Sequence, residues 1–191
     1  MLSVDEKSQI QALDRTQPGL PLKRGRGLTM THDYERHGTT TLFAALNTRN
    51  GEVTGMCRQK HRHQEWLCFL RHIERVTPPD KQIHIIFCDN YATHKHAAVR
   101  RWISSNPGFH VRFTPTSESW LNMVERFFCD LTANRLKRGV FRGLEELIMA
   151  VGDCIDRHNL KSKPFIWTAG ARDILEKVTR ARKTLDNPQS L

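Results

Sequence analysis

The acid Asp89 follows the apolar run Ile83–Phe87 closely, at a point in the chain where a carboxylate could do chemistry. The run is nearly unbroken and rich in β-branched residues, which is typical of a strand buried on both faces of a parallel sheet. In open α/β sheets, functional groups gather at the carboxyl ends of the strands. Asp89 is therefore a candidate metal ligand or catalytic group. The alternative is a solvated loop acid or a helix cap.

Two further acids, Asp5 and Glu125, stand where they could reach the same place. Asp5 falls in a strand predicted over residues 2–9, in which alternation puts Asp5 and Glu6 on opposite faces. Glu125 lies at the edge of the apolar stripe of a helix predicted over residues 119–138, so its carboxylate can face a cleft. Carboxylates suit hard cations such as Mg²⁺, and two such ions can clamp both oxygens of an in-line phosphodiester displacement.

A particular order of elements is needed to bring the three acids together. Asn50-Gly51 predicts a hairpin between strands at residues 38–47 and 53–57. Helices are predicted over residues 64–76, 97–105, 143–158 and 169–183, and a last strand over residues 110–113. This order predicts an α/β fold, a ribonuclease-H-like mixed five-stranded sheet flanked by helices. In that plan the first and fourth strands are neighbours, which places Asp5 beside Asp89 and brings Glu125 to the same cleft.

The chain of 191 residues fits one domain, predicted over residues 1–183, with a disordered tail over residues 184–191. Its formal net charge of +10 favours polyanionic partners, nucleic acid first. Lys23, Arg24 and Arg26 lie in a long loop predicted over residues 14–36 and are candidate phosphate contacts; the alternative is a solvated charge run. Five scattered cysteines argue against a zinc site and for a cytoplasmic protein. No apolar run approaches the roughly 20 residues that span a bilayer.

Several stretches, taken in their order along the chain, carry a resemblance to a known family. They are Val4-Asp5-Glu6-Lys7-Ser8, Asp89-Asn90-Tyr91-Ala92-Thr93-His94-Lys95, Phe113-Thr114-Pro115-Thr116-Ser117, Ser119-Trp120-Leu121-Asn122-Met123-Val124-Glu125-Arg126, His158-Asn159 and Lys163-Pro164-Phe165-Ile166-Trp167-Thr168. Together they resemble the catalytic core of bacterial insertion-sequence transposases of the mariner superfamily, which are named for an Asp-Asp-Glu triad. Between Asp89 and Glu125 lie 35 residues, positions 90 to 124, in agreement with the spacing in that family.

The resemblance implies a metal-dependent enzyme that cuts DNA and joins the freed 3′-hydroxyl to a target, usually at a TA dinucleotide. Asp5 would bridge two Mg²⁺ or Mn²⁺ ions, Asp89 would bind one ion, and Glu125 would bind the other. The partners would be double-stranded DNA, at the element ends and the target, and a second copy of the chain, in the nucleoid-associated part of the cytoplasm. The further candidate DNA contacts are Asn90, His94, Asn122 and Arg126.

Two other functions are compatible with the sequence. Members of the resembled family normally carry an N-terminal helix-turn-helix region, and no such segment precedes Met1. The chain could therefore act as a catalytically inactive fragment that binds DNA or pairs with an intact transposase. A ribonuclease or repair nuclease of the same plan is the third possibility, and activity on DNA compared with RNA–DNA hybrids would separate it from the first.

Overall fold

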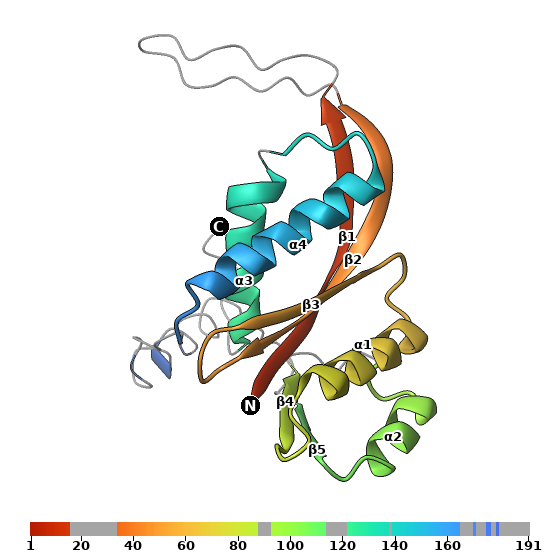
Figure 1. Cartoon of the computed structure of the whole chain (residues 1–191), viewed down its shortest axis with the longest axis vertical. Coiled ribbons are helices and arrows are strands. Elements are labelled where there is room, and N and C mark those ends of the chain that lie inside the picture. Colours follow the sequence, from red (N-terminus) through yellow and green to blue (C-terminus); the bar gives the residue numbers. More distant parts are fainter. Residues whose placement is uncertain are drawn as a thin grey trace, which may run out of the picture.

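The computed structural model describes residues 1–15, 34–87, 93–113, 122–137, 139–164, 170, 175, 176 and 179. Within this part, one sheet has the strand order β3-β2-β1-β4-β5 (Figure 1). Its strands are β1 (Leu2–Arg15), β2 (Tyr34–Asn47), β3 (Val53–Arg58), β4 (Ile83–Phe87) and β5 (Phe109–Phe113). The pairs β1–β2 and β2–β3 are antiparallel, whereas β1–β4 and β4–β5 are parallel. The structure confirms the predicted ribonuclease-H-like mixed five-stranded sheet, with the first and fourth strands adjacent.

The strand β1 is longer than predicted, at 14 residues. The prediction of a short first strand and a loop from residue 14 was wrong because β2 pairs with β1 as far as Arg15, opposite Tyr34. The register shifts between Lys7 and Ile10, where Gln9 has a φ of 53°. Such a bulge interrupts the alternation from which a strand is recognised in a sequence. Figure 1 shows the resulting long hairpin of β1 and β2 projecting beyond the short strands.

The helices begin and end close to their predicted bounds. They are α1 (His63–Val76), α2 (Ala97–Ser104), α3 (Met123–Leu131), which continues into the π-helical turn η2 (Thr132–Leu136), and α4 (Leu144–Leu160). The helix predicted from residue 119 is described from Met123 onward, with Asn122 as its N-cap. Most of the helix predicted over residues 169–183, and the tail, lie outside the described residues. No helix in the described part has the length and apolar character needed to cross a membrane.

Two hydrophobic cores cover the two faces of the sheet. Alternate residues of β2 divide between them: Leu42, Ala44 and Leu46 join one core, while Phe43 and Ala45 join the other. The first core also contains residues of α3 and α4, and the second contains residues of α1, α2 and β4. The helices α3 and α4 therefore cover one face, and α1 and α2 cover the other. Figure 1 shows these two pairs of helices on different sides of the strands.

The strand β4 is only partly covered. Ile83 and Ile85 are buried in the core formed with α1 and α2. His84, between them, is exposed, and its ring stacks on that of His110 in β5 at 4.6 Å between centroids. The prediction of a strand buried on both faces is therefore wrong at His84. The reason is that the main contacts of α3 and α4 with the sheet are to β1, β2 and β3, and not to β4 and β5.

The C-terminal end of α4 is fastened to the turn between β2 and β3. The side-chain amide of Asn159 accepts a hydrogen bond from Val53 N and donates one to Val53 O, both at 2.8 Å. His158 Nε2 lies 2.9 Å from Gly51 O. Gly51 has a φ of +78°, and a Cβ there would meet Lys163 O at 2.1 Å. The turn of the hairpin predicted from Asn50-Gly51 therefore also binds the C-terminal end of α4.

Candidate active site

Asp5 lies near the start of β1, on the face of the sheet covered by α3 and α4. It stands opposite Ala44, which belongs to the core on that face, and it is 9% exposed. Its Oδ1 accepts a hydrogen bond from the backbone N–H of Glu6 at 2.8 Å. Its Oδ2 accepts a hydrogen bond from Asn122 Nδ2 at 2.9 Å. The orientation of this carboxylate is therefore fixed from two sides.

Glu125 lies in the first turn of α3, at the end of the helix that meets β1. Its backbone N–H donates to Asn122 O at 3.2 Å, and Asn122 is the residue that contacts Asp5. The side chain of Glu125 is partly exposed. The structure thus brings the N-terminal turn that carries Glu125 against Asp5, although 119 residues separate the two acids in the sequence (positions 6 to 124).

The third predicted acid, Asp89, lies outside the described residues. The described part of β4 ends at Phe87, which pairs with Val4 of β1, the neighbour of Asp5. The adjacency of the first and fourth strands, from which the position of Asp89 was predicted, is therefore present. The position of the Asp89 carboxylate itself stays a prediction.

Asn122 and Ser3 join α3 to β1 beside the acids. Asn122 is 3% exposed; its Oδ1 accepts from Ser3 Oγ and from Val124 N, and its Nδ2 donates to Val4 O and Asp5 Oδ2. Ser3 Oγ in turn accepts from Met123 N at 3.0 Å. The sequence reasoning did not single out Ser3, although strand alternation puts it on the same face as Asp5.

Glu6 and His94 form a second buried contact, on the opposite face of the sheet. Glu6 stands opposite Phe43, in the core with α1 and α2, as strand alternation predicts. Its Oε2 lies 3.2 Å from Nε2 of His94, and the His94 ring lies 4.6 Å from that of Trp66. His94 is 3% exposed. The contact with Glu6 therefore holds His94, five residues after Asp89 in the sequence, to β1 on the face opposite Asp5.

The predicted DNA contacts have different surroundings. Arg126 is exposed, and its Nε lies 3.8 Å from Asp130 Oδ2, one helical turn away. The side chains of Asn122 and His94 are buried in protein contacts. A contact with DNA by any of the three stays a prediction. The candidates Lys23, Arg24, Arg26 and Asn90 lie outside the described residues.

The types of donor present at this site fit a hard divalent cation. Asp5 and Glu125 offer carboxylate oxygens, the ligands that Mg²⁺ and Mn²⁺ prefer. Each carboxylate oxygen has two lone pairs, so the hydrogen bonds that Asp5 accepts do not prevent ligation by the same oxygens. No cluster of three metal-binding side chains occurs among the described residues, which do not include Asp89. The predicted third acid of the site, Asp89, stays a prediction.

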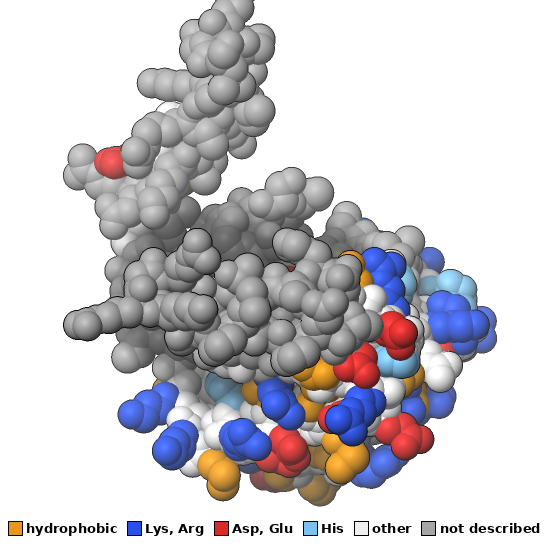
Figure 2. Space-filling model, turned by 90° about the horizontal axis from the view of Figure 1, so that it is seen from above, with side chains coloured by type: hydrophobic (Ala, Val, Ile, Leu, Met, Phe, Trp, Pro, Cys, Tyr) orange, Lys and Arg blue, Asp and Glu red, His pale blue; other side chains and the backbone are white. Residues whose placement is uncertain are grey.

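The basic charge of the chain is spread over the surface that can be seen. Figure 2 shows Lys and Arg side chains distributed over the described part of one face, with Asp, Glu and hydrophobic side chains between them. The formal net charge of +10 is therefore not gathered into a single basic patch on that part of the face.

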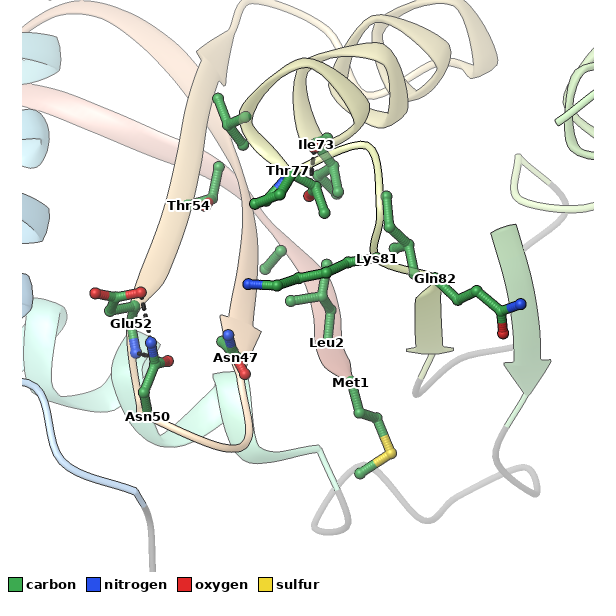
Figure 3. A pocket seen from close by; sticks show the side chains of 14 residues that line it. Met1, Leu2, Asn47, Asn50, Glu52, Thr54, Ile73, Thr77, Lys81 and Gln82 are labelled. Carbon is green, nitrogen blue, oxygen red and sulfur yellow. Dashed lines mark hydrogen bonds between the residues drawn. The ribbon is translucent and has the colours of Figure 1, made fainter. Parts of the chain in front are cut away.

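A hollow of the described surface, drawn in Figure 3, has neither Asp5 nor Glu125 in its lining. It is lined at the N-terminal ends of β1 and β4 and at the turn between β2 and β3, including Met1, Leu2, Asn47, Asn50, Glu52, Lys81 and Gln82. The parallel strands β1 and β4 run from this hollow towards the end where Asp5 lies. Its lining carries one lysine, Lys81, and one carboxylate, Glu52, and offers no acid pair for a metal.

One family model matches the larger part of this chain. The sequence model of the family described as DDE superfamily endonuclease matches residues 1–148. The comparison with curated proteins found no match. Among solved structures, the catalytic core domain of BIV integrase is similar, with 18% identity and a TM-score of 0.47 over 77% of this chain and 93% of that chain. An intasome of simian T-cell lymphotropic virus, solved with the PP2A regulatory subunit B56 gamma, has 15% identity and a TM-score of 0.44 over 62% and 41%.

Proposed function

This chain belongs to the DDE superfamily of endonucleases, and we propose that it is the catalytic domain of a DNA transposase. Its reaction would be metal-dependent DNA strand cleavage followed by strand transfer. The observation that carries the proposal is the contact of the N-terminal turn of α3, bearing Glu125, with the Asp5 carboxylate through Asn122. The motif resemblance favours an insertion sequence of the mariner superfamily as the source of the enzyme.

The proposed roles combine the family resemblance with the described positions of Asp5 and Glu125. Asp5, fixed by Glu6 N and Asn122 Nδ2, would be shared between two Mg²⁺ or Mn²⁺ ions. Glu125 would hold one ion from the first turn of α3, and Asp89 the other from beyond the end of β4. The ions, when bound, supply the charge stabilisation for the attacking and leaving oxygens of the phosphodiester. The acids would position them, and the hydrogen bonds from Glu6 N and Asn122 Nδ2 hold the Asp5 carboxylate in one orientation.

The proposed partner is double-stranded DNA, at the element ends and at a TA target, and the proposed working form is a homodimer on DNA. The chain's positive charge favours contact with phosphates. Arg126 is an exposed candidate on the same helix as Glu125. Lys23, Arg24 and Arg26 are the further candidates, and their substitution should weaken binding to all DNA sequences about equally.

The test removes one acid at a time. Asp5→Asn, Asp89→Asn and Glu125→Gln should each abolish nicking of duplex DNA with Mn²⁺ or Mg²⁺, because positioned charge supplies most of the rate enhancement in such sites. Binding to DNA without metal should persist in all three variants. Added Mn²⁺ should raise the melting temperature of the parent and not of the variants, since only the parent has the complete site.

The matched control is Glu145→Gln. Glu145 lies in the first turn of α4, as Glu125 does in α3, and is exposed. Glu6→Gln is a poor control, since Glu6 is largely buried against His94. Nicking by all three acid variants at the parent's rate would refute the proposed mechanism. A parent that binds DNA and nicks with neither metal would instead support the inactive-fragment alternative.

A further inference from the structure

We propose that Asn122 is the positioning residue of the metal site, assisted by Ser3, and that it sets the affinity of Asp5 for a divalent ion. The inference rests on the proposed function, because it concerns the same acids. The side chains that carry it, Asn122 and Ser3, are not members of the acidic triad. Its basis is a buried amide that touches the Asp5 carboxylate at one end and starts the helix carrying Glu125 at the other.

The orientation of the Asn122 amide is determined by its partners. On one side, Oδ1 accepts hydrogen bonds from Ser3 Oγ and from Val124 N. On the other side, Nδ2 donates to Val4 O at 3.3 Å and to Asp5 Oδ2 at 2.9 Å. A flipped amide would place an acceptor against two acceptors, the Val4 carbonyl and the Asp5 carboxylate, in a site where Asn122 is 3% exposed. The orientation shown is therefore strongly preferred.

Ser3 completes the arrangement from β1. Its hydroxyl donates to Asn122 Oδ1 and accepts from the backbone N–H of Met123 at 3.0 Å. The same hydroxyl thus fixes the amide and satisfies one of the orphan N–H groups at the start of α3. Ser3 is 3% exposed, so water cannot readily replace either hydrogen bond. The start of α3 and the segment of β1 that carries Asp5 are consequently held as one unit.

This unit would prepare the acids for the ion. A carboxylate held in one rotamer loses less conformational freedom when it binds a cation, and the outer partners of metal ligands typically contribute 10–100-fold to affinity or activity. The hydrogen bond from Nδ2 also holds Asp5 at a fixed place relative to the first turn of α3. Without that bond, the Asp5 carboxylate loses the restraint on Oδ2.

Asn122→Ser separates this role from helix capping. Serine keeps a side-chain acceptor for an N-cap, while its shorter side chain lacks the amide group that donates to Asp5. We expect Asn122→Ser to bind Mn²⁺ about 10–100-fold more weakly than the parent, measured by electron paramagnetic resonance of free Mn²⁺ during titration. Nicking should recover as Mn²⁺ is raised. Ser3→Ala, which keeps the Asn122–Asp5 bond and removes its support, should weaken Mn²⁺ binding less and gives a second variant if the first folds poorly.

The matched control is His96→Ser at the N-cap of α2, where the His96 ring accepts from Ala98 N at 3.2 Å. This change also replaces a cap, and should leave Mn²⁺ affinity unchanged. Equal loss of Mn²⁺ affinity in His96→Ser and Asn122→Ser would show a general loosening and overturn the inference. Parent-like Mn²⁺ affinity in Asn122→Ser and Ser3→Ala, with affinity lost in Asp5→Asn, would also overturn it and leave the proposed function standing. Equal Mn²⁺ affinity in the parent and Asp5→Asn would refute the proposed function itself.

Discussion

Substitution of Asn159 by Ala should destabilise the fold at the junction of α4 with the hairpin of β2 and β3. Asn159 makes two hydrogen bonds of 2.8 Å with the backbone of Val53, one as acceptor and one as donor. Val53 is 2% exposed and stands at the start of the edge strand β3. Alanine would leave both backbone groups of Val53 without these partners.

The expected magnitude follows from those two groups. A buried donor or acceptor left unsatisfied costs about 1–3 kcal/mol. Alanine has the better helix propensity, which offsets roughly 0.5 kcal/mol near the end of α4. The net loss should therefore be about 1.5–5.5 kcal/mol in the free energy of unfolding, and the melting temperature should fall by about 3–22 °C for a chain of this size.

Asn159→Asp adds a test of direction. One carboxylate oxygen would still accept from Val53 N, and the other would replace the amide nitrogen and face Val53 O. At neutral pH these two oxygens repel, so the variant should be at least as unstable as Asn159→Ala. Below about pH 4 a carboxyl is protonated and can donate to Val53 O. The stability deficit of Asn159→Asp relative to the parent should therefore shrink as the pH falls.

Urea unfolding followed by far-ultraviolet circular dichroism measures these changes, and hydrogen exchange at the Val53 amide reports the local opening. Asp156→Ala is the control, because Asp156 lies on the exposed side of the same helix and its loss should change stability by less than about 0.5 kcal/mol. If the unfolding free energy of Asn159→Ala also differed from that of the parent by less than about 0.5 kcal/mol, the conclusion that Asn159 anchors α4 to β3 would be refuted.

Two further predictions concern side chains with shifted pKa values. The hydrogen bond from Arg62 lowers the pKa of Glu65 from 4.5 to about 2, so Glu65→Gln should lower the melting temperature at pH 7 by about 1–3 °C. That difference should disappear as the pH falls from 4.5 to about 2, where the parent loses the same charge; a pH-independent difference would contradict it. Burial raises the pKa of Cys57 to about 11, so iodoacetamide at pH 8 should alkylate Cys57 at least ~10-fold more slowly than exposed Cys129, and equal labelling by mass spectrometry would refute this.

The sequence by itself determined the elements whose signal is local. The apolar stripe of α1 predicted its buried residues Trp66, Phe69, Leu70 and Ile73, because a helix repeats every 3.6 residues. The Asn-Gly pair predicted the hairpin at Gly51, where a positive φ is needed. The order of elements then predicted which strands are neighbours. It also predicted that Asp5 and the start of the helix with Glu125 would meet.

Only the tertiary structure decided features that depend on partners distant in the sequence. The length of β1 came from its pairing with β2, which supplies ladder hydrogen bonds even where polar residues show no alternation. The exposure of His84 depended on which strands α3 and α4 cover. The inward position of Asn122, predicted as a DNA contact and found against Ser3 and Asp5, was set by the packing of α3 on β1. Hydrophobic periodicity carries no information on which polar group a buried amide will satisfy, since that partner is chosen only when the two elements pack together.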